Sequence, residues 1–384
     1  AWRLPAAAAA VLLVAAAAIW TPRSLFAGSF SASEASYPLI AFREGREGTV
    51  TVHESRPPMP VEKRIDVDGL NVAGTSFMLQ TLQTLQGHLP FFVNPEASCA
   101  VQIGFGTGQT SRNALTHPLA RFDLVEISPD VMELASELFR ELNGNVAADD
   151  RFHPKILDGK NHLKYTRDRY DVIMNDANYA VASASASLFT RDHFENGRRK
   201  LSPGGLFSTW MTTDLHPEDF RIVLKTFQSV FPHALLWMAP NCINKQVVLM
   251  GSAEPLRLDL GRMNVLFTNP EIRSSLAAVN IGSAYELMAC LLLDEKGMQA
   301  LTAGAATATD DRPILEYSNR DIRARDWCAY QNLAMMMTRP PVWSEYVSGL
   351  PAAVKDRAAV EEALARHYQA SRQLFSGILD FYRG

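Results

Sequence analysis

The sequence predicts an α/β protein whose main domain is a doubly wound, mostly parallel sheet. Apolar strand-like segments alternate with helical ones from Cys99 to about residue 255, which is typical of a sheet covered by helices on both faces. Glycines directly follow the first of these strands, and the next three strands end in the acidic residues Glu126, Asp158 and Asp176. Because the carboxyl ends of parallel strands meet at one edge of a sheet, we expect these groups to share one crevice.

The composition favours a small-molecule substrate over a nucleic-acid partner. Of the 384 residues, 20% are charged, and the formal net charge is -4, without a basic stretch or an acidic tail. The four cysteines are scattered, with no CxxC pair and no histidines at metal-ligand spacing. We therefore expect no metal cofactor.

The first 23 residues predict a transmembrane helix. Seventeen residues without a charge run from Leu4 to Trp20, with Arg3 and Arg23 on either side. This length is just enough to cross a bilayer, and the Thr-Pro-Arg sequence after Trp20 fits a retained span better than a cleaved signal. A buried Ala-rich helix or an uncleaved signal is the alternative. The expected location is the membrane, with the catalytic domain on the cytoplasmic side, and the start at Ala1 is compatible with a longer product that carries earlier spans.

The next segments predict a linker and a β-rich subdomain. Residues 24–36 are small and polar, as in a linker. Residues 37–94 contain short stretches in which apolar and polar residues alternate between glycine-containing turns, which indicates antiparallel strands. A helix is expected from Ser76 to His88, ended by Leu89-Pro90.

Two regions make up the remainder of the chain. Residues 95–255 carry the alternating strands and helices of the doubly wound domain, and residues 256–384 form a region that is mainly helical by pattern. Its clearest amphipathic run covers residues 352–379. This C-terminal region is interpreted as a packing appendage or a surface for self-association.

The glycine loop predicts a nucleotide site. Gly104, Gly106 and Gly108 stand between a strand and a helix, where backbone amides can approach a ligand without obstruction by a Cβ atom. Glu126 follows Gly108 by eighteen residues and can accept hydrogen bonds from ribose hydroxyls, as in dinucleotide sites. Acids at the ends of the third and fourth strands favour an adenosyl ligand over a dinucleotide. The alternative for each acid is a role as a helix cap or turn residue.

The motifs VQIGFGTG, DLVEISPDVMELA, ILDGKNHL, YDVIMNDA and SLFTRDHFENGRRKLSPGGLFSTW resemble the spermidine synthase (polyamine aminopropyltransferase) family, and more closely its bacterial members fused to transmembrane segments. The resemblance implies a Rossmann-like sheet of the S-adenosylmethionine-methyltransferase type and a homodimer. It also implies decarboxylated S-adenosylmethionine as co-substrate and release of methylthioadenosine. By position, it assigns the ribose to Glu126, the adenine edge to Asp158 with Gly159, a nucleoside contact to Gln83, and the role of general base to Asp176.

This chain departs from the family pattern at two acidic positions. Thr107 stands where the family's glycine loop has an aspartate, and Tyr179 stands where the loop after the fourth strand has a second acid. Each lost carboxylate removes a partner for a cationic amine. Tyr179 is therefore expected to shape the pocket for an atypical, non-putrescine acceptor.

Several functions stay open from the residues. The first is a transferase that uses S-adenosylmethionine or its decarboxylated form. The second is internal cleavage of intact S-adenosylmethionine, by a lyase or cyclase reaction, with Thr107 tolerating its carboxylate; a methyltransferase belongs beside it. The third is a non-catalytic membrane nucleotide sensor. His88, His193 and His233 are weaker candidates for a base.

Overall fold

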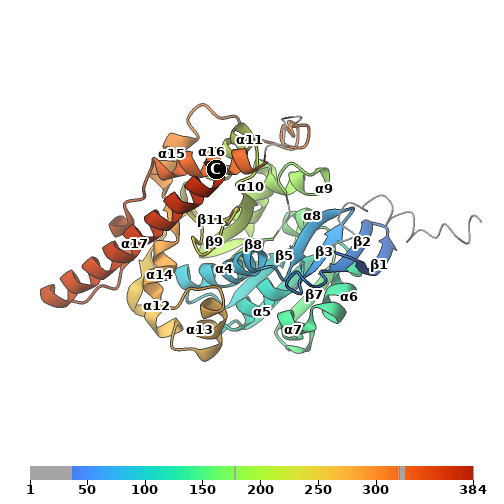
Figure 1. The fold of residues 1–384 in the computed structure, drawn as a ribbon, viewed down its shortest axis with the longest axis horizontal. Helices are drawn as coiled ribbons and strands as arrows, with labels where there is room; N and C mark the ends of the chain where they lie inside the picture. Colours follow the sequence, from blue (N-terminus) through green and yellow to red (C-terminus); the bar gives the residue numbers. More distant parts are fainter. Residues whose placement is uncertain (1–36, 177–178, 319, 321–324, 384) are drawn as a thin grey trace, which may run out of the picture. The chain divides into compact units, whose positions relative to one another are not determined.

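The computed structural model describes residues 37–176, 179–318, 320 and 325–383 (Figure 1). The chain divides into two compact units, with the boundary between Ser76 and Phe77.

The described part of the first unit is a four-stranded antiparallel sheet in the order β1-β2-β3-β4. Its apolar core includes Val50, Val52 and Ile65, and the polar residues Thr51, His53 and Asp66 beside them are buried too. The strands are β1 (Leu39–Gly45), β2 (Gly48–Glu54), β3 (Lys63–Val67) and β4 (Leu70–Gly74).

The second unit contains an eight-stranded sheet in the order β13-β10-β11-β9-β8-β5-β6-β7. The five strands from β9 to β7 in this order are parallel, while β11 and β13 run antiparallel to their neighbours. The first strand of this sheet along the chain, β5, lies between β8 and β6, so the strand order reverses direction at β5. Ligands of such sheets bind at this reversal. The strands are β5 (Cys99–Ile103), β6 (Arg121–Glu126), β7 (Phe152–Ile156), β8 (Tyr170–Asn175), β9 (Leu201–Thr212), β10 (His233–Trp237), β11 (Gln246–Ser252) and β13 (Leu291–Leu293).

Helices cover both faces of this sheet (Figure 1). One face carries a buried cluster that joins Val101, Ile103 and Ile173 of the strands to α8, α10 and α11. The other face receives α4, which contacts β8, β9 and β11, and α5, which packs against α4. These helices and the short ones between them are α4 (Phe77–Val93), α5 (Gln109–Leu115), α6 (Pro129–Leu138), α7 (Arg140–Asn143), α8 (Gly159–Tyr165), α9 (Ser183–Ala186), α10 (Arg191–Lys200) and α11 (Pro217–Gln228). The predicted Rossmann-like sheet is therefore confirmed.

Helix α4 continues beyond the predicted stop at Pro90 and ends at Val93. A proline inside a helix removes one backbone hydrogen bond and costs ~3 kcal/mol. Phe91 and Phe92 follow it and are each only 1% exposed. Burying two such side chains contributes about 1.5–3 kcal/mol each, which offsets the cost of the proline. The prediction that Pro90 ends the helix is thus wrong because tertiary burial outweighs local propensity.

The C-terminal region is mainly helical and ends in the 30-residue helix α17 (Val354–Arg383). This helix packs against α14 and α16. The elements that precede it are β12 (Leu258–Asp259), α12 (Leu260–Leu266), α13 (Pro270–Ala277), α14 (Ala284–Ala289), α15 (Glu295–Leu301), α16 (Arg325–Met337) and β14 (Val347–Ser348), which pairs with β12.

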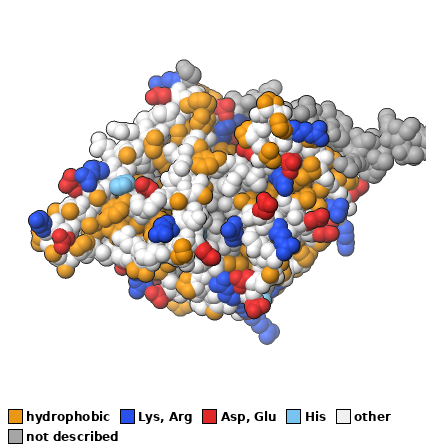
Figure 2. All heavy atoms as spheres, turned by 60° about the horizontal axis from the view of Figure 1, so that its bottom comes forward, with side chains coloured by type: hydrophobic (Ala, Val, Ile, Leu, Met, Phe, Trp, Pro, Cys, Tyr) orange, Lys and Arg blue, Asp and Glu red, His pale blue; other side chains and the backbone are white. Residues whose placement is uncertain are grey.

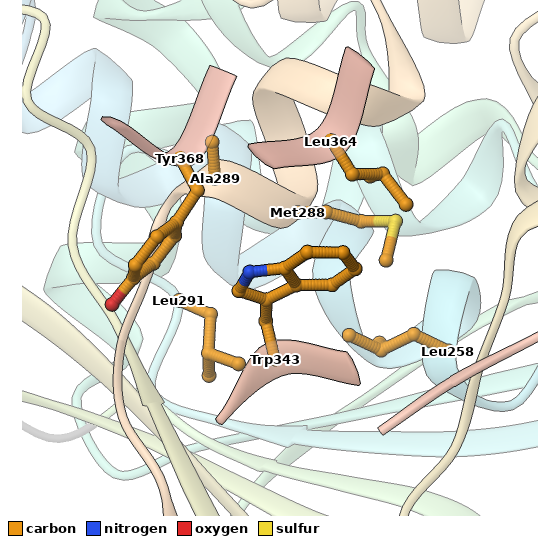
Figure 3. A pocket seen from close by; sticks show the side chains of 7 residues that line it. All are labelled: Leu258, Met288, Ala289, Leu291, Trp343, Leu364 and Tyr368. Carbon is orange, nitrogen blue, oxygen red and sulfur yellow. The ribbon is translucent and has the colours of Figure 1, made fainter. Parts of the chain in front are cut away.

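An apolar cluster attaches α17 to the rest of this unit. Figure 3 shows the Trp343 indole at its centre, with Met288 and Leu364 on one side and Leu291 on the other. The cluster leaves a cavity of about 10 Å³, which is about the room that one water molecule needs. Leu364 of α17 is buried, so its contacts here hold the helix in place.

The structure corrects the prediction of a membrane-anchored protein. Among the described residues, none of the helices combines the length and the apolar character that crossing a bilayer requires. The predicted span, residues 1–23, and the predicted linker, residues 24–36, lie outside the described residues. The expected transmembrane helix and membrane location are therefore wrong for the part of the chain that the structure describes.

Charges of both signs share the face drawn in Figure 2, where Lys and Arg side chains alternate with Asp and Glu. This mixture matches the small net charge of the sequence. The expected homodimer stays a prediction.

Leu364→Ala should lower the free energy of unfolding by about 2–5 kcal/mol, because it opens a cavity beneath α17. Denaturant unfolding of the full chain measures this change. Leu374→Ala is the matched control on the same helix, since Leu374 is 54% exposed and its loss should change stability by less than about 0.5 kcal/mol. Equal effects of the two substitutions would contradict the assigned role of Leu364.

Candidate functional site

The glycine loop at the carboxyl end of β5 is shaped by close backbone packing. Gly104, Gly106 and Gly108 have φ angles of 90°, 57° and 83°, a region that other residues rarely adopt. A Cβ atom at Gly104 would lie 2.7 Å from the carbonyl oxygen of Asp176. The Asp176 amide also donates to the Ile103 carbonyl over 2.8 Å. The loop and the end of β8 are therefore in direct contact.

Glu126 binds the loop from the end of β6. Its Oε2 accepts a hydrogen bond of 2.8 Å from the Phe105 amide, and its Oε1 accepts one of 2.8 Å from the Ser128 amide. Burial raises the pKa of this carboxyl, while the backbone amides lower it. A carboxylate oxygen can accept two hydrogen bonds, so each oxygen keeps capacity for a ligand hydroxyl.

Asp158 and Gly159 lie at the start of α8. Asp158 caps this helix, since its Oδ1 accepts a hydrogen bond of 2.6 Å from the Asn161 amide. The alternative interpretation of this acid as a helix cap is thus correct, although its other oxygen is not used in the cap. A Cβ atom at Gly159 would lie 2.3 Å from Cγ2 of Ile103, so the glycine lets α8 approach the end of β5.

Gln83 and Thr107 are brought together by the packing of α4 against the loop. The Thr107 hydroxyl donates to Oε1 of Gln83, and Nε2 of Gln83 donates to the Leu79 carbonyl over 3.0 Å. Thr107 is fully buried. Its side chain therefore joins the loop to α4 in this structure.

Asp176 is the titratable group at the centre of this arrangement. Burial raises the pKa of its carboxyl to about 7, and the nearby Glu126 adds to this rise. Its Oδ2 accepts a hydrogen bond of 3.0 Å from Nε2 of Gln102. A carboxyl with a pKa near 7 can exchange a proton readily at physiological pH, which suits a general base.

Tyr179 follows Asp176 after residues 177–178, which lie outside the described residues. The Arg325 guanidinium lies over the Tyr179 ring, 5.5 Å from its centroid. Burial raises the pKa of the phenol, and the nearby Asp214 adds to this rise. Tyr179 thus stays protonated at neutral pH and is close to charges of both signs.

Sequence reasoning missed four side chains near these groups. Gln102 was detectable as the one amide inside the apolar strand CAVQI, and Asp214 as an acid just after β9. Asp214 is 7% exposed, and its Oδ1 accepts a hydrogen bond of 2.7 Å from the Thr212 hydroxyl. Ile127 and Leu157 are exposed apolar residues beside the ends of β6 and β7, where an aromatic base could pack.

The three histidine candidates lie elsewhere in the structure. His88 contacts His117 and Ser275, and His193 is enclosed with Phe194 and Phe207. Burial lowers the pKa of both His88 and His193 to about 3. His233 contacts Glu295 over 2.9 Å. Within the described residues, no group of three His, Cys, Asp or Glu side chains could hold a metal ion.

Comparison with known proteins identifies one family. Residues 80–255 match the family described as "Spermine/spermidine synthase domain". The chain is 30% identical over 158 residues to the polyamine aminopropyltransferase of Bacillus mycoides (strain KBAB4), which covers 40% of this chain and 55% of that protein. It is 32% identical over 142 residues to the polyamine aminopropyltransferase of Prochlorococcus marinus (strain MIT 9312), and this match covers 35% of this chain and 49% of that protein. The chain thus spans about half the length of these relatives.

Two solved structures have a similar fold. One is a spermidine synthase in complex with the transition state analogue AdoDATO, with a TM-score of 0.54 and 18% identity over 69% of this chain and 88% of that chain. The other is a probable spermidine synthase from Corynebacterium glutamicum ATCC 13032, with a TM-score of 0.51 and 17% identity. This match covers 71% of this chain and 97% of that chain. At these identities the likeness shows the fold alone.

Gly104→Ala should abolish binding at the loop and destabilise the fold, because the new methyl group would overlap the Asp176 carbonyl. Gly204→Ala is the matched control: its φ is 72° but nothing lies within 4 Å of the added Cβ, so it carries only the backbone strain of about 1–2 kcal/mol. Thermal unfolding and nucleoside titration of both variants separate strain from overlap. A Gly104→Ala protein that unfolds and binds like Gly204→Ala would disprove the close contact.

Proposed function

We propose that the chain transfers an aminopropyl group from decarboxylated S-adenosylmethionine to an amine, on the premise that residues 80–255 match the spermine/spermidine synthase domain family. The observation that supports the proposal best is the convergence of the glycine loop, Glu126 and Asp176 at the end of β5. The relatives named above are aminopropyltransferases, and one similar structure holds a transition state analogue.

The proposed binding of the nucleoside uses groups at the ends of three strands, β5, β6 and β7, and one group of helix α4. Glu126 accepts hydrogen bonds from the ribose hydroxyls, and the loop amides pack against the ligand. Asp158 and Gly159 meet the adenine edge, and Ile127 and Leu157 pack on its faces. Gln83 of α4 accepts a hydrogen bond from Thr107 of the loop and contacts the nucleoside or the sulfonium arm.

The proposed reaction is a displacement at carbon. The acceptor nitrogen forms a bond to the aminopropyl methylene that is attached to sulfur. The carbon–sulfur bond breaks, its electron pair stays on sulfur, and neutral methylthioadenosine leaves. The proton lost by the nitrogen goes to Asp176, whose pKa near 7 lets it accept and later release this proton.

Asp214 is proposed to bind the acceptor amine in place of the acid that Tyr179 replaces. A buried carboxylate is costly unless a cation or several hydrogen bonds accompany it. In the described parts of the chain, Asp214 forms no ion pair, and its one side-chain hydrogen bond comes from Thr212. Asn332 of α16 donates to the carbonyls of Thr213 and Leu215 over 2.8 and 2.7 Å, which fixes the segment around Asp214. An ammonium group of the acceptor would supply a counter-charge for this carboxylate.

The purified chain should form methylthioadenosine from decarboxylated S-adenosylmethionine only when a polyamine is present. Mass spectrometry of the nucleoside product, with each form of the cofactor and with a panel of amines, tests this. Methylthioadenosine from intact S-adenosylmethionine without an amine would indicate cleavage instead. Adenosylhomocysteine would indicate methyl transfer, and binding without any product would indicate a sensor.

Asp176→Asn should lower kcat by about 10²–10⁴-fold, because the amide cannot accept the proton. In the wild type, kcat/KM should fall as the pH drops below about 7, since the Asp176 carboxyl becomes protonated there. Steady-state rates from pH 5.5 to 9 measure both effects. Unchanged affinity for methylthioadenosine serves as the folding control, and wild-type turnover by the variant would exclude Asp176 as the base.

Asp214→Asn should raise KM for the amine by about 10- to 100-fold, the value of one charge-assisted hydrogen bond, with KM for the cofactor unchanged. Asp171→Asn is the control, because Asp171 accepts from the amides of Ser98 and Cys99 at the opposite edge of the sheet. If both variants leave KM for the amine unchanged, Asp214 does not bind the acceptor.

A further inference from the structure

Gln102 is an unusual residue for the centre of a parallel sheet. It lies in β5, between β8 and β6, and its side chain is 0% exposed. Burial of an amide is costly unless its polar atoms are hydrogen-bonded. The contacts of this side chain therefore indicate why a polar group is tolerated here.

The Gln102 amide is hydrogen-bonded on both sides. Its Nε2 donates to the Gly104 carbonyl over 2.7 Å and to Oδ2 of Asp176 over 3.0 Å, and its Oε1 accepts from the Ser111 hydroxyl over 2.8 Å. The Gly104 carbonyl oxygen and the Asp176 carboxylate oxygen are hydrogen-bond acceptors, so the NH₂ group of Gln102 must face both of them. The orientation of the amide is thereby fixed.

This arrangement joins the glycine loop, α5 and the end of β8 through one side chain. Ser111 lies on α5 and holds the amide oxygen from the face of the sheet opposite to Val101 and Ile103. The two N–H donors then hold the Gly104 carbonyl and the Asp176 carboxylate at a fixed separation. Hydrogen bonds to a carboxylate also favour its charged form.

We propose that Gln102 is a positioning residue that sets both the orientation and the proton affinity of Asp176. This inference rests on the proposed role of Asp176 as the base. Other groups also face this carboxyl: Glu126 from β6, Thr110 from α5 and Trp210 from β9. Gln102 differs from them because it contacts the loop and the carboxylate at once, so it couples the shape of the nucleotide site to the charge of the base.

The first test measures the proton affinity of Asp176 without turnover. Carbon-13 NMR of the full chain labelled at its aspartate carboxyl groups gives this titration, with Asp176→Asn to assign the signal. Gln102→Met keeps the length of the side chain but removes the donors, and the pKa of Asp176 should rise by about one pH unit. Ser111→Ala removes only the hydrogen bond to the amide oxygen of Gln102, so it should raise the pKa of Asp176 by a smaller amount.

Gln86→Met is the matched control. Gln86 is also 0% exposed and accepts a hydrogen bond of 3.1 Å from Ser208, but it lies on α4 and does not contact Asp176. The Gln86→Met substitution should leave the titration of Asp176 unchanged. Equal titrations of the wild type and Gln102→Met, or the same rise in Gln86→Met, would overturn the inference. If Gln102→Met does not fold, the rise expected in Ser111→Ala decides the question alone.

The second test uses the reaction. In Gln102→Met the acidic limb of the pH profile of kcat/KM should shift to higher pH by as much as the pKa measured by NMR rises. The value of kcat should fall about 10-fold or more, and KM for the cofactor should stay unchanged. A loss of kcat without any shift of the profile would indicate a merely structural role. If the wild type transfers no aminopropyl group, the proposed function fails, whereas the NMR titration still tests the action of Gln102 on Asp176.

Discussion

The close approach of the Gly104 backbone to the Asp176 peptide is the constraint on which the rest of the site depends. A Cβ atom at Gly104 would lie 2.7 Å from the Asp176 carbonyl oxygen, so this contact exists only with glycine. It brings the end of β8 against the loop after β5. Through the hydrogen bond from Phe105, the same loop also holds Glu126 of the neighbouring strand. One backbone contact therefore sets the positions of Glu126 and Asp176 relative to each other.

The two acids are stabilised in different ways, and the difference suits different tasks. Glu126 accepts hydrogen bonds from two backbone amides, which cannot move without unfolding the loop. Such fixed donors make a rigid acceptor for hydroxyl groups. Asp176 is held by the side chain of Gln102, and burial raises its pKa to about 7. A carboxyl in this environment can change its protonation state, which the proposed base requires.

The differences between expectation and structure have physical causes. Pro90 normally marks the end of a helix, yet α4 continues past it because Phe91 and Phe92 gain more from burial than the lost hydrogen bond costs. The apolar run at the start of the chain suggested a membrane span; it lies outside the described residues, and none of the described helices could cross a bilayer. Local patterns report the preference of a segment, and packing decides whether that preference is kept.

The sequence by itself determined the α/β class, the loop glycines, and the strand ends where Glu126, Asp158 and Asp176 lie. These features depend on local periodicity and on backbone conformations that few residues adopt. Only the tertiary structure decided the hydrogen-bond partners. Gln102 and Asp176 are 74 residues apart, and Thr107 and Gln83 are 24 apart. Such pairs depend on strand order and on how each helix packs against the sheet, and no short segment of sequence contains that information.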